Sequence, residues 1–302
     1  MKKILITGGT VFVSKYVATY FAKKGEDVYV LNRNHYPQPE GVNLIEGDRH
    51  RLGNRLKNQE FDVVLDITAY TKRDIQDLAE ALGKIEQYIF ISSSAIYPES
   101  LPQPFSEEQK GGYNSIWGDY GVNKYEAELY LQEQVENYYI VRPPYLYGPM
   151  QNLYREGFVF DCAMQDRPFY LPADGSMPLQ FFHIEDLCRF LEILMEQQPT
   201  ERIFNVGNSE IVDIREWVRF CYSAAGKTPE FLSVDSSHSQ RSYFCFHDYG
   251  YVLDVSKQNM LLKDTKPLAE GLQESFAWYK ENQDKVTKRP YFEYISGHIA
   301  KI

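Results

Sequence analysis

The feature that most constrains the fold is an alternation of short apolar runs with helical patterns in the first half of the chain. Apolar runs occupy residues 4–6, 28–31, 42–45, 63–65 and 88–91, and apolar residues at helical spacing follow the first run and recur at about 74–82. Continuous apolar runs are typical of strands covered on both faces, and strands alternating with helices indicate a parallel sheet. Because such crossovers are right-handed, the sequence predicts an α/β fold with a doubly wound parallel sheet.

The second half of the chain is less regular. Helical patterns lie near residues 120–135, 158–165, 185–195, 213–225 and 268–282, with strands expected at 138–141 and 203–206. A chain of 302 residues exceeds the usual size of one hydrophobic core. We therefore expect a dinucleotide-binding domain of the Rossmann type at 1–150 plus about 183–206. A smaller mixed α/β substrate lobe is expected at about 151–182 plus 207–302.

Charge and hydropathy exclude several classes of protein. The net charge of −10 argues against broad non-specific binding of nucleic acid, which is itself a polyanion. No apolar run approaches the roughly 20 residues of a membrane-spanning helix, and the N-terminal apolar run is too short for a secretory signal. We expect a cytoplasmic protein. The four cysteines lack zinc-site spacing, so no metal site is expected.

A glycine pair directly follows the first strand. Thr7, Gly8, Gly9 and Thr10 separate that strand from the first helix. Glycines permit a tight turn, and a helix N-terminus offers free N–H groups and a positive dipole end, so this arrangement is typical of a pyrophosphate-binding turn. The alternative is a plain strand-to-helix turn.

The end of the second strand bears on the choice of nicotinamide cofactor. An acidic residue there would accept hydrogen bonds from a ribose 2′-hydroxyl, whereas an arginine accommodates a 2′-phosphate. This chain has Asn32 and Arg33 at that place, which slightly favours NADP over NAD. Alternatively, Arg33 is a solvated loop charge.

Three features suggest acid/base chemistry at the carboxyl edge of the sheet. Tyr120 and Lys124 are four residues apart, hence on one face of a predicted helix. A nearby ammonium would lower the pKa of the Tyr120 hydroxyl and make it a usable general acid/base. Ser92, Ser93 and Ser94 end the fifth strand, where a hydroxyl could polarise a substrate oxygen.

Taken in order, these motifs resemble those of extended short-chain dehydrogenases/reductases of the NAD-dependent epimerase/dehydratase type. The matching stretches run from residue 4 to about residue 280, so the resemblance covers nearly the whole chain. They are Thr7-Gly-Gly-Thr10, Ile45-Glu-Gly-Asp48, Ile91-Ser-Ser-Ser-Ala-Ile-Tyr97, Tyr120-Gly-Val-Asn-Lys124, Val141-Arg-Pro-Pro-Tyr-Leu-Tyr-Gly-Pro149, Gln180-Phe-Phe-His-Ile-Glu-Asp-Leu187 and Phe204-Asn-Val-Gly207.

The resemblance implies roles for individual residues. Tyr120 would be the acid/base, Lys124 its partner and a ribose ligand, and Ser93 the third catalytic residue, with Ser94 as the competing choice. Asp48 would bond the adenine amino group, and Tyr145 would lie near the nicotinamide. The residues expected to bind the cofactor are Gly8, Gly9, Thr10, Phe12, Val13, Asn32, Arg33, Asp48, Arg49, Thr68, Ala69 and Tyr145.

The chain also departs from the family pattern. Val11 and Ser14 replace two glycines of the phosphate turn, and the branched Val11 side chain would obstruct the phosphates unless it points away. Tyr145 and Leu179 stand where members that act on UDP-sugars have Asn and Arg, so a standard nucleotide-sugar is disfavoured. These departures are similar to an atypical branch that includes the chloroplast stem-loop RNA-binding proteins.

Two functions are therefore expected. The first is an NAD(P)-dependent oxidoreductase or epimerase that transfers hydride on a sugar-like or small carbonyl substrate with Ser93, Tyr120 and Lys124. The alternative is a non-catalytic nucleotide-sensing or RNA-associated protein on the same fold, although the acidic balance disfavours nucleic acid. His183 and Asp186 are expected to stabilise a strand-to-helix corner. A homodimer is expected by analogy only.

Overall fold

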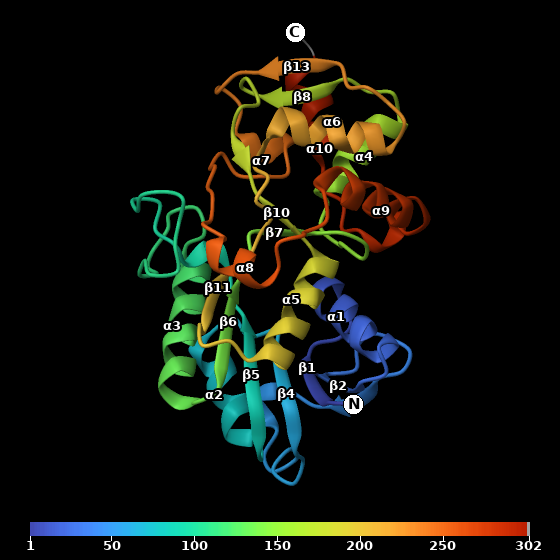
Figure 1. Ribbon diagram of the computed structural model, residues 1–302. Coiled ribbons are helices and arrows are strands. Elements are labelled where there is room, and N and C mark those ends of the chain that lie inside the picture. Colours follow the sequence, from blue (N-terminus) through green and yellow to red (C-terminus); the bar gives the residue numbers. More distant parts are fainter. Residues whose placement is uncertain (301–302) are drawn as a thin grey trace. The chain divides into compact units, whose positions relative to one another are not determined.

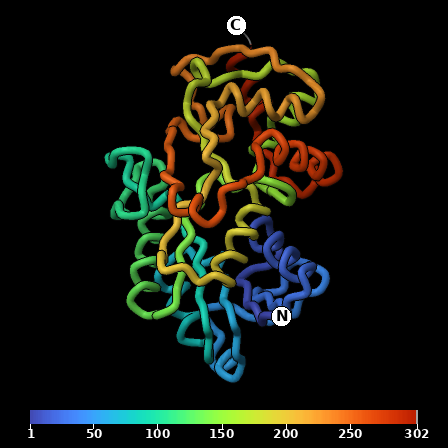
Figure 2. Tube along the Cα trace, in the orientation of Figure 1, coloured from blue at the N-terminus to red at the C-terminus, as the bar shows by residue number. Residues whose placement is uncertain are grey.

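The computed structural model describes residues 1–300, which divide into two compact units (Figure 1). Unit 1 comprises Met1–Leu146, Ile184–Gly207 and Leu253–Asp264. Unit 2 comprises Tyr147–His183, Asn208–Val252 and the described residues from Thr265 onward. Two later segments, Ile184–Gly207 and Leu253–Asp264, return to unit 1, and they can be followed by their yellow and orange colours in Figure 2. No helix within residues 1–300 is long and apolar enough to cross a membrane.

Unit 1 is built on a seven-stranded parallel sheet in the order β11-β6-β5-β4-β1-β2-β3. The predicted doubly wound fold is confirmed, since the chain starts at an interior strand, β1, and winds outward in both directions. The strands are β1 (Lys3–Thr7), β2 (Asp27–Asn32), β3 (Asn43–Glu46), β4 (Phe61–Asp66), β5 (Ile85–Ile91), β6 (Tyr138–Arg142) and β11 (Ile203–Asn205).

Helices cover both faces of this sheet. On one face α1 (Phe12–Lys23) packs on α5 (Ile184–Gln197), and on the other α2 (Lys72–Ala81) packs on α3 (Asp119–Gln134) (Figure 1). Apolar side chains of the central strands and of α2 and α3 form a fully buried core, among them Val64, Phe90 and Ile140. Burial on both faces explains why these strands are continuous apolar runs in the sequence.

The start of α2 is fixed by a reciprocal cap. The Thr71 side chain accepts a hydrogen bond from the Asp74 backbone N–H, and the Asp74 carboxylate accepts from the backbone N–H of Thr71. Asp74 also accepts from the backbone N–H of Tyr70 at 2.9 Å. This capping box holds the loop between β4 and α2 in place, at the edge of the sheet where ligands bind in such folds.

Unit 2 is smaller and has an aromatic core. Trp217 is fully buried, and its ring lies 5.9 Å from Phe181 and 5.1 Å from Phe246, centroid to centroid. Its main elements are β7 (Tyr145–Tyr147, where the chain passes out of unit 1), α4 (Glu156–Met164), β8 (Phe169–Pro172), β9 (Pro178–Leu179), β10 (Phe181–His183), β12 (Val212–Asp213), α6 (Ile214–Ala224), β13 (Phe231–Val234), α7 (Gln240–Tyr243), α9 (Leu268–Glu281) and α10 (Tyr291–Tyr294).

The division into units differs from the expected domains in one segment. Residues 207–302 were expected to lie wholly in the smaller lobe, yet Leu253–Asp264, which contains α8 (Ser256–Leu261), belongs to unit 1. Polar contacts account for this placement. The backbone N–H of Asp254 donates to the Phe105 carbonyl, and the buried Gln258 side chain bonds both the N–H and the C=O of Gly207.

Candidate active site

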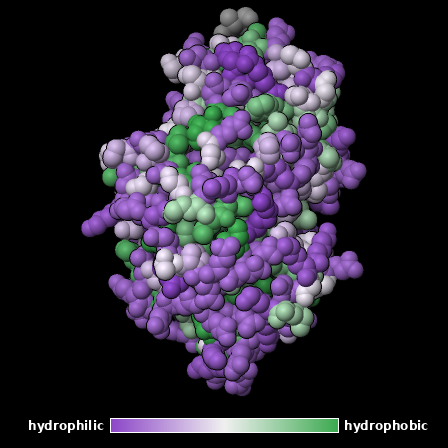
Figure 3. All heavy atoms as spheres, in the orientation of Figure 1, coloured by the Kyte–Doolittle hydropathy of each residue, from purple (hydrophilic) through white to green (hydrophobic). Residues whose placement is uncertain are grey.

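A cavity of about 390 Å³ opens at the carboxyl ends of β1, β2 and β4. It is lined by Thr7, Gly8, Thr10, Leu31, Asn32, Arg33, His35, Tyr36, Gly47, Asp48, Arg49, His50, Thr68 and Tyr70. Strand order reverses between β1 and β4, and open α/β sheets bind ligands at such a switch point. The volume lies within the range of small-molecule sites. The face of unit 1 that Figure 3 shows is largely hydrophilic.

The glycine turn after β1 requires glycine for packing as well as for conformation. Gly8 and Gly9 both have φ near +90°, which side chains rarely adopt. A Cβ at Gly8 would lie 2.8 Å from Ser14 Oγ and from Thr68 Cγ2, and one at Gly9 would lie 2.6 Å from Val30 Cγ1. The turn thus brings the backbone of β1 close to α1, to β2 and to the loop after β4.

The two replaced glycines are accommodated in this turn. Val11 precedes α1 in an extended conformation, is 43% exposed and is not among the residues that line the cavity. Ser14 is buried, and its hydroxyl donates to the Val11 carbonyl at 3.0 Å. Neither Val11 nor Ser14 is among the residues that line the cavity. Together with the α1 N-terminus, the turn fits the pyrophosphate of a dinucleotide.

The far end of the cavity carries the residues that follow β2 and β3. The Asn32 side chain donates to the Gly8 carbonyl at 2.6 Å and to Gln38 at 2.9 Å, so it ties two loops together. Arg33 is exposed and also lines an adjoining hollow of about 290 Å³. A hydrogen bond from the backbone N–H of His50 is the main cause that lowers the pKa of Asp48.

A buried ion pair between Arg49 and Asp66 lies at the cavity, whose lining includes Arg49. Arg49 donates to Asp66 at 2.8 Å, and the fully buried Asp66 also accepts from Thr7 Oγ1 at 2.7 Å and from the Tyr88 hydroxyl at 2.6 Å. Burial raises the pKa of Tyr88 well above its ordinary value, which keeps that hydroxyl a donor. Asp66, at the end of β4, therefore joins the end of β1 and the middle of β5 to Arg49 of the cavity wall. Sequence analysis missed Asp66, although an acid that ends a buried strand is a visible signal.

Ser93, Tyr120 and Lys124 come from two neighbouring elements. Ser93 precedes a short 3₁₀ turn (Ser94–Ile96) and accepts from the Ala95 backbone N–H at 3.1 Å. Tyr120 lies in the first turn of α3 and is 40% exposed, whereas Lys124, one turn later, is 2% exposed. The Lys124 ammonium donates to the Ile91 carbonyl at 2.8 Å. Ser94, the competing serine, is buried.

The pKa of Tyr120 departs from the sequence expectation. Burial raises it, a hydrogen bond with the Ser93 side chain acts in the opposite sense, and Tyr70 raises it further. Lys124 is not among these causes, and its ammonium donates to the Ile91 carbonyl. Burial lowers the pKa of Lys124 to about 8, although the carboxylates of Asp66 and Glu128 oppose this shift.

The expected cofactor residues fall into two groups. Those that line the cavity are Gly8, Thr10, Asn32, Arg33, Asp48, Arg49 and Thr68. Those that do not are Gly9, Phe12, Val13, Ala69 and Tyr145. Packing accounts for three of the latter, since Gly9 faces Val30 while Phe12 and Ala69 are buried in the core. Tyr70 and Tyr36 line the cavity but were not foreseen.

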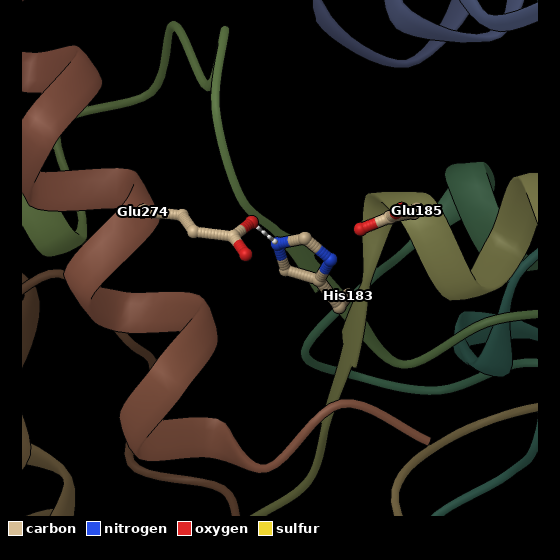
Figure 4. A group of neighbouring side chains, drawn as sticks. All are labelled: His183, Glu185 and Glu274. Carbon is tan, nitrogen blue, oxygen red and sulfur yellow. Dashed lines mark ion pairs between the residues drawn. The ribbon is translucent and has the colours of Figure 1, made fainter. Parts of the chain in front are cut away.

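His183 ends β10, and α5 begins at the next residue. Within unit 2, Glu274 of α9 points toward its ring, with Oε2 3.5 Å from Nε2 (Figure 4). Burial, with Lys266 as a second cause, lowers the pKa of His183 to about 3. Burial thus favours the neutral form of the imidazole. This is consistent with the packing role expected at a strand-to-helix corner.

Comparison with known proteins bears on the whole chain. The profile of the NAD dependent epimerase/dehydratase family matches residues 4–207. The chain belongs to this family. One relative of this chain is the chloroplast stem-loop binding protein of 41 kDa b of Arabidopsis thaliana. It is 29% identical, and the match covers 91% of this chain and 78% of the relative. A dTDP-D-glucose 4,6-dehydratase of Mus musculus is 22% identical over 93% and 89%.

Solved structures of the family share the fold. A dTDP-glucose 4,6-dehydratase of Bacillus anthracis in complex with NAD superposes with a TM-score of 0.76 at 18% identity, covering 95% of this chain and 99% of that one. A UDP-glucuronic acid 4-epimerase of Bacillus cereus in complex with UDP-glucuronic acid and NAD gives 0.71 at 20% identity, covering 92% and 99%. The predicted membership of the family, and the similarity to its stem-loop binding branch, are thus confirmed.

Proposed function

We propose that this protein is an NAD(P)-dependent oxidoreductase or epimerase that transfers hydride on a sugar-like or small carbonyl substrate. The observation that carries the proposal is the arrangement of Ser93, Tyr120 and the buried Lys124 on two contacting elements, in the same unit as the cavity at the carboxyl edge of the sheet. Tyr120 and Ser93 can then share one substrate oxygen, as acid/base and as hydrogen-bond partner. The family and the solved relatives in complex with NAD support a nicotinamide cofactor.

The residues divide the chemistry between them. When bound, the nicotinamide group supplies or accepts the hydride. The glycine turn and Thr68 would hold the phosphates, and Asp48 would hold the adenosine end. Tyr120 takes the proton from a substrate hydroxyl or returns it, while Ser93 orients the oxygen. Lys124, once its ammonium is released from the Ile91 carbonyl toward Tyr120, would favour the charged form of the Tyr120 hydroxyl.

Cofactor choice and substrate class follow from two positions. We propose NADP in preference to NAD, because the exposed Arg33 is free to meet a 2′-phosphate at the cavity rim. Leu179 is buried in β9, where it pairs with Val212 of β12. A leucine offers no charge to a diphosphate, so a substrate without a nucleoside diphosphate is favoured.

The test is a turnover assay that reports hydride transfer. The purified protein is incubated with NADP⁺ or NAD⁺ and a panel of sugars, sugar phosphates, nucleotide-sugars and small alcohols. Reduced cofactor is read by its absorbance for a net oxidation, and the epimerised product is read by chromatography for a reaction that returns the hydride. Tyr120→Phe should lower the rate by roughly 10²- to 10⁴-fold. Tyr130→Phe on the same helix is the matched control and should retain the wild-type rate. Full turnover in Tyr120→Phe would refute the mechanism.

A second function is favoured by the rim of the cavity. Arg33, His50 and Arg51 are exposed there or beside it, and Tyr36 exposes 60% of its surface. Arginine side chains with an exposed aromatic ring suit unstacked nucleotides, and one relative is named for stem-loop binding. Filter binding of a stem-loop RNA over a salt series tests this function. Salt-sensitive binding that NADPH displaces, in a protein without turnover, would favour it over the enzyme.

A further inference from the structure

Tyr70 lies on the loop between β4 and α2 in unit 1, between the cavity and the pair Tyr120 and Lys124. Its backbone is fixed by the hydrogen bond to Asp74, but 55% of its surface is exposed and it lines the cavity. Its ring centroid lies 6.2 Å from that of Tyr120 and 5.1 Å from Lys124 Nζ. One side chain thus contacts both Tyr120 and Lys124 as well as the expected cofactor site.

The surroundings of Lys124 indicate which contact of its ammonium a bound ligand can replace. An ammonium has three protons to donate; one goes to the Ile91 carbonyl, and the rings of Phe90 and Tyr70 lie 4.8 and 5.1 Å from Nζ. Within residues 1–300, Lys124 has no carboxylate as a hydrogen-bond or ion-pair partner. Phe90 is fully buried and fixed, whereas Tyr70 is half exposed on a loop.

Cation–π attraction is strong when the cation is desolvated, as Lys124 is here. A ribose hydroxyl that enters the cavity would offer the same ammonium a hydrogen bond, so the ring and the ribose compete. While the ammonium rests against the Tyr70 ring and the Ile91 carbonyl, it acts less on the neighbouring Tyr120.

We propose that Tyr70 is a positioning residue whose ring competes with the nicotinamide cofactor for the Lys124 ammonium. Tyr70 thereby sets both how tightly the cofactor binds and how strongly Lys124 acts on Tyr120. The competition rests on the proposed function, because it requires a bound nicotinamide cofactor. The contacts of Tyr70 with Lys124 and Tyr120 are present without a cofactor.

The test compares Tyr70→Leu with Tyr70→Phe. The phenylalanine variant keeps the ring and removes the ionisable hydroxyl, so the comparison isolates the ring itself. We expect Tyr70→Leu to bind NADPH or NADH roughly three- to tenfold more tightly than Tyr70→Phe in calorimetric titration, the upper figure being about 1.4 kcal/mol. Tyr36→Leu, at an exposed tyrosine of the same cavity, controls for the loss of a rim aromatic.

A second readout needs no cofactor. Tyrosine labelled with ¹³C at Cζ is titrated by NMR, and the Tyr120 resonance is identified by its loss in Tyr120→Phe. In Tyr70→Leu the Tyr120 midpoint should lie below that in Tyr70→Phe by roughly half a pH unit or more, because Lys124 is released toward Tyr120.

The outcomes separate this inference from the proposed function. Equal midpoints, or weaker cofactor binding in Tyr70→Leu than in Tyr70→Phe, would overturn the role of Tyr70 while leaving a dinucleotide-binding enzyme intact. Absence of binding to any dinucleotide in the wild type would refute the proposed function and the competition together. A lowered Tyr120 midpoint in Tyr70→Leu would even then support the action of the Tyr70 ring on Lys124 and Tyr120.

Discussion

Replacing Lys124 by methionine should change how the stability of the protein depends on pH. Lys124 is 2% exposed, and burial lowers its pKa from 10.5 to about 8. Below pH 8 both folded and unfolded chains carry the proton, and the cost of burying the charge is fully present. Between pH 8 and 10.5 the unfolded chain binds more protons, so the free energy of unfolding rises with pH. Above 10.5 the cost is gone.

The size of the effect follows from the shift. Each pKa unit corresponds to 1.36 kcal/mol, so a shift of this size amounts to about 3 kcal/mol in total. Between pH 7 and 10 the wild type should gain about 2 to 3 kcal/mol in unfolding free energy relative to Lys124→Met, which lacks the titrating group. The variant should therefore hold its largest advantage at neutral pH and lose most of it by pH 10.

Urea unfolding at a series of pH values, followed by circular dichroism, measures this difference. Lys72→Met is the matched control: Lys72 is exposed, and its ammonium also lies over a tyrosine ring, 5.4 Å from the Tyr130 centroid. The control should follow the wild-type curve within about 0.5 kcal/mol. If the curves of Lys124→Met and the wild type run parallel from pH 7 to 10, Lys124 does not carry a buried charge and the reasoning is wrong.

Three further substitutions test other parts of the site. Asp66→Ala leaves the Arg49 guanidinium without its buried partner and should cost about 3 to 5 kcal/mol in urea unfolding, whereas a cost below about 1 would contradict the buried pair. Val11→Gly should change dinucleotide affinity less than about threefold in calorimetry, because the Val11 side chain is exposed outside the cavity; a large gain would show that valine obstructs the phosphates. Arg33→Ala should weaken NADPH binding about tenfold and leave NADH within about twofold, and equal losses would remove Arg33 from cofactor choice.

The sheet of unit 1 could be predicted almost residue by residue from the sequence. Strands buried on both faces must be apolar throughout, so runs such as 63–65 and 88–91 marked β4 and β5 within a few residues. Long amphipathic helices such as α5 and α9 were equally visible. The two-residue strands β9 and β12 were not, because no periodicity can be read from two residues.

The site was less predictable where side chains depend on distant partners. Spacing alone placed Tyr120 and Lys124 on one helix face, but it could not show that the ammonium would bond the Ile91 carbonyl and leave the pKa of Tyr120 raised. The pairing of Arg49 with Asp66 joins the segment after β3 to the end of β4, 17 residues further along the chain. Such contacts depend on the strand order, which brings β4 and the segment after β3 to one edge of the sheet.

The central claim is that the cavity at the carboxyl edge of the sheet holds a nicotinamide dinucleotide. Calorimetric titration of the full chain with NADPH and with NADH tests it most directly. We expect saturable binding with one site per chain, tighter for NADPH than for NADH because of Arg33. Absence of saturable binding for both, in protein whose circular dichroism shows it folded, would contradict the claim.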